Sequence, residues 1–154
     1  MAASKKKKII QKEIPVGRKI EQSENPDKYY AENPAWAFVN IDNDMWAFTK
    51  ENIDDSIWTE IIPFLKSLES QTWNEILIRD KKKNHSIQIK DLNKIAQERL
   101  IMRFIEAESL ISLRITGKHR LYGYMTGRVY NILWYDDNHG DNETCVCKSN
   151  LKHT

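Results

Sequence analysis

Three strand-like runs, separated by two short glycine-containing turns, constrain the fold of this chain more than any other feature. Across residues 110–116 apolar side chains alternate with polar ones, as in a strand that buries one face. Residues 119–125 and 128–135 are rich in Tyr, Ile, Val, Leu and Trp, which favour strands. Gly117-Lys118 and Thr126-Gly127 are turn-forming pairs between the runs. The pattern predicts a three-stranded antiparallel β-meander.

The residues before the meander have helical character. Residues 54–70 carry apolar side chains at helical spacing and predict an amphipathic helix, with Pro63 kinking its solvent side. Thr72 and Glu75 have the spacing of a capping box and predict the start of a short second helix. A third helix is predicted from a cap at Asp91 to about residue 104. Because helices and strands are segregated along the chain, the predicted fold class is α+β.

A repeated aromatic triplet lies closer to the N-terminus. Trp-Ala-Phe occurs at residues 36–38 and again at residues 46–48, with the turn formers Asp42-Asn43-Asp44 between them. This arrangement predicts a β-hairpin over residues 35–48, with aromatic side chains facing each other across its strands. We interpret the repeat as packing. The predicted architecture is this N-terminal hairpin and the helices packed on the C-terminal antiparallel meander.

The length of 154 residues predicts one domain with tails. Residues 1–34 form a basic stretch without strand or helix periodicity and are predicted to be a flexible arm. Residues 35–139 form the α+β domain, and residues 140–154 a polar C-terminal segment. No run approaches the ~18 apolar residues of a spanning helix, and no apolar block follows the N-terminal lysines. We therefore expect a cytoplasmic protein that does not associate with a membrane.

The net charge of +2 hides an uneven distribution. Residues 1–19 hold seven basic and one acidic residue, whereas residues 20–60 hold two basic and ten acidic residues. Residues 109–135 contain four cationic residues and no acidic one. Such a segment attracts phosphate. The alternative is that acidic residues elsewhere in the fold pair with these cations.

Four residues near the C-terminus are candidate metal ligands. They are His139, Cys145, Cys147 and His153. One residue separates the two cysteines, whereas structural zinc sites commonly have two to four between them. We therefore favour two reduced cysteines and expect no metal and no other cofactor. The chain also lacks a Gly-x-Ser-x-Gly nucleophile motif and the glycine-rich loops that bind nucleotides.

Residue types suited to RNA chemistry gather in and beside the meander. Metal-free cleavage of RNA needs a base for the 2′-hydroxyl, a cation for the phosphate and an acid for the leaving oxygen. Arginine holds phosphate bidentately, histidine exchanges protons near neutral pH, and tyrosine stacks on bases. The alternative is that the tyrosines pack in the core and the arginines flank a sheet edge. The residues are Arg114, Lys118, His119, Arg120, Tyr122, Tyr124, Arg128, Tyr130 and His139.

The meander contains the run LRITGKHRLYGY at residues 113–124 and the run VYNILWYD at residues 129–136, and His139 follows them. Together these features resemble the C-terminal half of the RelE/ParE toxin superfamily. The order of elements resembles the family over about residues 35–139, and the amino-acid sequence resembles it over about residues 110–139. It implies that Arg120 holds a phosphate and that His139 is a general acid or base. It also implies auxiliary phosphate contacts from Lys118 and Arg128. The predicted RNA-binding residues are Arg114, Lys118, Tyr122, Tyr124 and Arg128.

We therefore expect a toxin-like protein that acts on RNA in a bacterial toxin–antitoxin or mobile-element system. It would be a metal-independent endoribonuclease or an RNA or ribosome binder, with RNA and a protein such as an antitoxin as partners. The alternative is a non-catalytic protein-interaction module with the same fold. The acidic stretch at residues 20–60 favours this alternative because it would repel RNA. The sequence predicts no oligomeric state.

Overall fold

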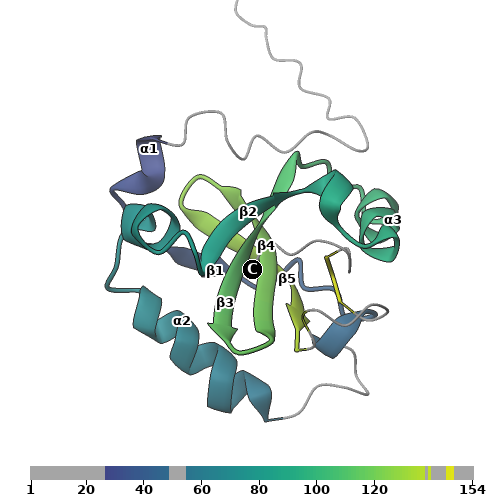
Figure 1. The fold of residues 1–154 in the computed structure, drawn as a ribbon, viewed down its shortest axis with the longest axis horizontal. Coiled ribbons are helices and arrows are strands. Elements are labelled where there is room, and N and C mark those ends of the chain that lie inside the picture. Colours follow the sequence, from purple (N-terminus) through teal and green to yellow (C-terminus); the bar gives the residue numbers. More distant parts are fainter. Residues whose placement is uncertain (1–26, 49–54, 138, 140–144, 148–154) are drawn as a thin grey trace, which may run out of the picture.

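The computed structural model of the chain describes residues 27–48, 55–137, 139 and 145–147. It is an α+β fold built on a five-stranded mixed sheet with the strand order β1-β5-β4-β3-β2 (Figure 1). The lysine-rich part of the predicted arm, up to residue 26, lies outside the described residues, as does His153. The strands are β1 (Ala35–Ala37), β2 (Asn84–Gln88), β3 (Ser109–Thr116), β4 (His119–Thr126) and β5 (Val129–Asp136).

The predicted antiparallel meander is confirmed by β3, β4 and β5, which pair in sequence order. Thr116 pairs with His119, so Gly117-Lys118 is the two-residue turn that the sequence predicts. The second turn lies one residue later than predicted, at Gly127-Arg128, because Thr126 itself pairs with Val129. Glycine at the first turn position fits both connections, since Gly117 has a φ of +46° and Gly127 a φ of +60°.

The predicted N-terminal hairpin is wrong. β1 pairs in parallel with β5, with Ala35 opposite Val129, and residues 46–48 form the short 3₁₀ helix η2 (Trp46–Phe48) instead of a second strand. β1 instead extends the sheet of the meander at its β5 edge, and its partner strand lies about 90 residues away in the sequence. The tryptophan of each triplet does pack against the core: Trp36 contacts the rings of Trp73 and Tyr130, while Trp46 contacts that of Trp134. Phe48 is also buried, whereas Phe38 is 50% exposed.

The predicted helix at residues 54–70 consists of two parts. A π-helical turn η3 (Ile57–Ile61) leads into α2 (Ile62–Leu68). Pro63 is exposed near the start of α2, and the N–H of Ile62 bonds to the carbonyl of Ile57 five residues earlier. Because Pro63 has no N–H, the regular α-helical ladder cannot run through it. The interruption therefore falls where the sequence places the kink.

Two short-range predictions can be checked at helix starts. The capping box is present: the N–H of Thr72 donates to Glu75 Oε1 at 2.9 Å and the N–H of Glu75 donates to Thr72 Oγ1 at 3.2 Å. It opens a second π-helical turn, η4 (Glu75–Arg79). α3 (Lys94–Met102) begins after Asn93, whose side chain accepts from the N–H of Ile95. Asp91, the predicted cap, lies in the 3₁₀ turn η5 (Ile89–Asp91) instead.

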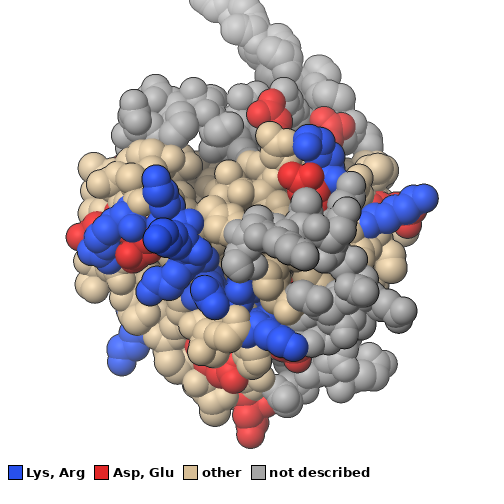
Figure 2. Space-filling model, in the orientation of Figure 1, with Lys and Arg blue, Asp and Glu red and all other residues tan. Residues whose placement is uncertain are grey.

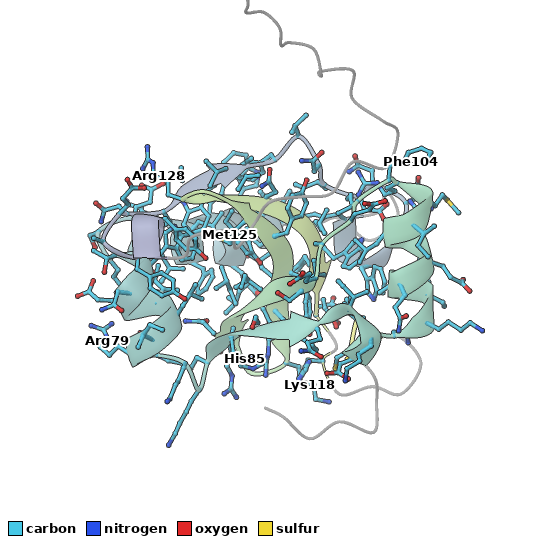
Figure 3. The ribbon with its side chains drawn as sticks, turned by 90° about the horizontal axis from the view of Figure 1, so that it is seen from above. Arg79, His85, Phe104, Lys118, Met125 and Arg128 are labelled. Carbon is cyan, nitrogen blue, oxygen red and sulfur yellow. The ribbon has the colours of Figure 1, made fainter. Side chains whose placement is uncertain are left out.

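The sheet is covered on both faces. One apolar cluster joins it to η3, α2 and η4, and a second joins it to α3 and residues 145–147. Figure 3, seen from above, shows the sheet running between these two helical layers. α1 (Asp27–Tyr30) precedes β1 and buries Tyr29, and the carbonyl of Glu32 accepts from the N–H of Trp73. Tyr29, Glu32 and Asn33 thus contact the domain. None of the helices in the described ranges is long and apolar enough to cross a membrane.

Candidate functional site

Arg120, near the start of β4, and Asp136, at the end of β5, are cross-strand partners next to the β3–β4 turn. Both are buried, with Arg120 2% exposed. Arg120 Nη1 donates to the carbonyl oxygens of Gly117 at 2.5 Å and His119 at 3.3 Å. Its Nε is buried without a hydrogen-bond partner among the described residues. Burial, followed by the neighbouring charge of Arg114, lowers the pKa of Arg120.

A second group of side chains lies at the same end of the sheet. The N–H of His139 donates to the carbonyl of Lys118 at 3.0 Å, which ties His139 to the β3–β4 turn. Its Nδ1 lies 3.8 Å from Cys145 Sγ and 3.7 Å from Cys147 Sγ. The Tyr122 hydroxyl lies 3.5 Å from the same nitrogen. His139, Tyr122 and the two thiols therefore form one cluster, which we call the thiol–histidine cluster.

The backbone of Val146 holds the two thiols in this cluster. Its N–H donates to Asp136 Oδ2 at 2.8 Å, and its carbonyl accepts from the N–H of Asn93 at 2.6 Å. Cys147 also forms a β-bridge with Leu92. These bonds fix residues 145–147 against β5 and the start of α3, so that both cysteines lie beside His139.

A third group, on the other side of the sheet, escaped the sequence analysis. Glu60 Oε1 lies 2.5 Å from His119 Nδ1 and accepts from the Tyr135 hydroxyl at 2.7 Å. The hydroxyl lies 2.9 Å from His119 Nδ1, and burial followed by Glu60 raises the pKa of Tyr135. His119 was among the candidates, but Glu60 is 59 residues earlier, and no sequence spacing signals that the two meet.

Cationic side chains converge beside β2 and β3. β2 pairs with β3 so that Asn84 lies opposite Leu113, and the backbone N–H of Arg114 donates to Asn84 Oδ1 at 3.0 Å. The pairing places position 114 next to the three lysines that precede β2. Lys118 is exposed in the β3–β4 turn, beyond the end of the same strand as Arg114. Figure 2 shows Lys and Arg gathered in a band across this side of the molecule. We call Lys81, Lys82, Lys83, Arg114 and Lys118 the basic face.

The predicted site residues divide by position. Arg120 and His139 lie at the same end of the sheet and both lie near Tyr122, so the fold brings the two predicted catalytic residues onto one face. Lys118 and Arg128 lie in the turns at opposite ends of β4, roughly 25 Å apart for a strand of this length. Figure 3 shows them on opposite sides of the molecule. A single phosphate cannot contact both.

The predicted base-stacking tyrosines lie inside the fold. Tyr122 is fully buried and Tyr124 is 6% exposed, and both belong to the core cluster that contains α3. The Tyr124 hydroxyl accepts from Asn40 Nδ2 at 3.0 Å. Neither ring presents a face on the surface, so cation–phosphate contact is the chemistry that the exposed predicted residues can offer.

Comparison with known proteins returned no match to a protein-family model, to a curated protein or to a solved structure.

Proposed function

We propose that the chain binds RNA at the basic face. The observation that carries the proposal is the antiparallel pairing of β2 with β3, in which Asn84 lies opposite Leu113 and accepts from the backbone N–H of Arg114. It joins the lysine-rich turn before β2 to the acid-free meander. Two cationic segments about 30 residues apart in the sequence thereby become one surface. Exposed lysines and a half-buried arginine in such a band supply sequence-independent contacts to phosphates.

The charge pattern supports a polyanionic partner. Residues 109–135 contribute no carboxylate, so Arg114 and Lys118 have no acidic neighbour on their own strands or turn. Arg114 also lies opposite the buried Arg120, and two adjacent positive charges repel. A phosphate bound near them relieves this repulsion. Protein partners with acidic surfaces are the competing class, and they predict that the chain binds no RNA at the basic face.

The proposal is for binding rather than cleavage. Arg120 is buried and its guanidinium bonds to backbone carbonyls, so a phosphate reaches the neighbouring Arg114 and Lys118 first. His139 Nδ1 faces two thiols and a buried hydroxyl. In the setting that the RelE/ParE resemblance implies, the chain acts as a toxin-like RNA or ribosome binder in the bacterial cytoplasm, held in check by an antitoxin.

Fluorescence anisotropy with a labelled single-stranded RNA of about 20 nucleotides tests the proposal on the full-length protein. The triple variant Lys81→Ala, Lys82→Ala, Lys83→Ala and the double variant Arg114→Gln, Lys118→Ala should each weaken binding about tenfold or more. A matched control, Lys66→Ala with Lys94→Ala, removes exposed lysines from α2 and α3 and should bind as the wild type does.

Two outcomes would contradict the proposal. Equal binding by the wild type and both basic-face variants would remove the basic face as the site. Equal loss in the control pair would indicate a response to net charge alone. A single-stranded DNA of the same sequence completes the series, because tighter binding of RNA indicates contacts to the 2′-hydroxyl.

The second candidate is the protein-interaction module, and the C-terminal part of α3 favours it. Ile101, Met102 and Phe104 are exposed there, beside a cavity of about 470 Å³ that Leu100 and Glu106 help to line. A partner segment with apolar side chains and a basic residue fits this surface. Ile101→Asp with Phe104→Asp should abolish co-purification with the product of a neighbouring gene and leave RNA affinity unchanged. Co-purification that survives these changes excludes this surface.

A further inference from the structure

The thiol–histidine cluster has the composition of a metal site. His139, Cys145 and Cys147 each offer one ligand atom, and these atoms all lie within 4.8 Å of one another. The thiols are not joined in a disulfide. We infer that His139, Cys145 and Cys147 bind a zinc ion. This inference is independent of RNA binding, because none of the three residues belongs to the basic face.

The distances from His139 Nδ1 to the two cysteine sulfurs are close to those in a tetrahedral zinc site. A nitrogen at about 2.0–2.1 Å and a sulfur at about 2.3 Å from a tetrahedral zinc are about 3.6 Å apart. The observed distances from His139 Nδ1 to the two sulfurs are 3.8 Å and 3.7 Å. The histidine therefore already stands where a zinc ligand stands relative to both thiols.

The two sulfurs lie closer together than in a zinc site. Cys145 Sγ and Cys147 Sγ are 2.8 Å apart, whereas two sulfurs on one tetrahedral zinc are about 3.8 Å apart. The 2.8 Å separation also exceeds the ~2.05 Å of a disulfide bond. A side-chain rotation that moves one sulfur about 1 Å away from the other gives the separation of a zinc site. The ion then lies between the two sulfurs and His139.

Tertiary contacts orient both cysteines toward His139 although only one residue separates them in the sequence. A single residue between two cysteines leaves little freedom to aim both sulfurs at one ion. Here the backbone of Val146 is held on both sides, by the Asp136 carboxylate and by the Asn93 N–H, and this orients both flanking cysteines toward His139. The site is thus built by tertiary contacts rather than by a local loop.

The charges around the cluster also fit bound thiolates. Cys145 and Cys147 are buried at 0% and 2% exposure, so a thiolate pair there needs nearby positive charge. A zinc ion supplies that charge, which two thiolates neutralise, whereas among the neighbouring side chains Arg120 attracts a Cys147 thiolate and Asp136 repels it. Three of the described residues supply ligands, which leaves the fourth position of the ion to a further ligand.

Cobalt substitution in the full-length protein tests the inference. The protein is purified under reductant, stripped with a chelator and titrated with Co²⁺ without oxygen. We expect one Co²⁺ per chain, the strong visible absorption of tetrahedral cobalt, and a sulfur-to-metal charge-transfer band that Zn²⁺ abolishes. Because the chain has only two cysteines, that band reports on Cys145 and Cys147 alone.

Variants identify the ligands. His139→Ala should weaken Zn²⁺ binding at least about tenfold, while the matched control His85→Gln should bind as the wild type does. Cys147→Ser should remove much of the charge-transfer band, and far-UV circular dichroism checks that each variant is folded. Zn²⁺ should also raise the melting temperature of the wild-type protein, and this measurement does not depend on whether a variant folds.

Three results would overturn the inference. The first is the absence of a charge-transfer band in protein whose two thiols titrate as reduced. The second is recovery of a Cys145–Cys147 disulfide under the same reductant, which would make the pair a redox couple. The third is unchanged Zn²⁺ affinity in folded His139→Ala protein.

Discussion

The backbone N–H of His139 donates to the carbonyl oxygen of Lys118 at 3.0 Å, and this bond ties the residue that follows β5 to the turn between β3 and β4. It brings three features to one end of the sheet: the buried Arg120–Asp136 pair, the thiol–histidine cluster and the end of the basic face. The proposed RNA surface and the inferred zinc site therefore share a structural neighbourhood without sharing residues.

The ion pair between Asp42 and Arg99 is predicted to be a main support of the fold. The Asp42 carboxylate is buried and accepts from Arg99 at 2.8 Å and 3.0 Å and from Trp134 Nε1 at 3.1 Å. Asp42→Ala leaves Arg99 without this partner and should lower the free energy of unfolding by about 3–5 kcal/mol in urea denaturation. Asp44→Ala is the matched control, because that carboxylate lies 3.5 Å from Arg99 but is 81% exposed. It should cost no more than about 1 kcal/mol, and equal losses for the two variants would contradict this account.

The same carboxylate predicts how stability depends on pH. Burial alone raises the pKa of Asp42, but hydrogen bonds from Arg99 and Trp134 outweigh it and hold the pKa below its ordinary value. A carboxylate with a depressed pKa in the folded state stabilises the protein fully above its unfolded pKa of about 3.9. The contribution is lost as the pH falls through the folded pKa. Between about pH 5 and pH 3, wild-type stability should therefore fall more steeply than that of Asp42→Asn. Parallel curves for the two proteins would show that Asp42 makes no such contribution.

Gly123 is predicted to be intolerant of any side chain. A Cβ at this position would collide with the carbonyl oxygen of Asn131 and lie 2.8 Å from Tyr130 Cζ. Because β5 backbone forms one wall, the clash cannot be relieved by a rotamer change. Gly123→Ala should destabilise the fold by about 1–3 kcal/mol or more. Ser86→Ala, on the exposed side of β2, should change stability by less than about 0.5 kcal/mol. Wild-type stability for Gly123→Ala would mean that β4 and β5 are further apart than described.

Substitutions at Arg120 and Arg114 are predicted to have different effects. The first should lower the stability of the fold, and the second should weaken RNA binding. Arg120→Ala removes a buried positive charge beside the buried Asp136 and should cost about 3 kcal/mol or more in urea denaturation. Arg114→Gln, at a half-buried position, should change stability by less than about 1 kcal/mol and weaken RNA binding. A stable Arg120→Ala protein that no longer binds RNA would instead assign Arg120 the phosphate-holding role that the family resemblance implies.

Predictions from sequence succeeded where short-range interactions decide the structure. The capping box joins Thr72 and Glu75, three residues apart, so the local pattern contains the whole motif. The meander also forms between strands that are neighbours in sequence. The 35–48 hairpin failed because the partner of β1 is β5, near the other end of the domain. Asp42, a turn former by its residue type, is instead a buried ion-pair partner 57 residues from Arg99.

The site was harder to predict than the fold. Strand-favouring residue types correctly put Arg120 and Tyr122 on a strand but could not show that helices cover both faces of the sheet and bury these two side chains. The approach of Cys145 and Cys147 to His139 depends on Asn93 and Asp136, which act from other elements. Likewise, the basic face depends on the pairing of β2 with β3, which joins two segments that are distant in the sequence.

The salt dependence of RNA affinity tests the central claim most directly. If the basic face neutralises phosphates, the logarithm of the association constant should fall linearly with the logarithm of salt concentration, with a slope of about −0.7 per phosphate contacted on a single strand. The variant that lacks Lys81, Lys82 and Lys83 should bind more weakly and with a shallower slope, while Lys66→Ala with Lys94→Ala should keep the wild-type slope. Wild-type affinity that does not change with salt, or a slope that stays the same when the three lysines are removed, would contradict RNA binding at the basic face.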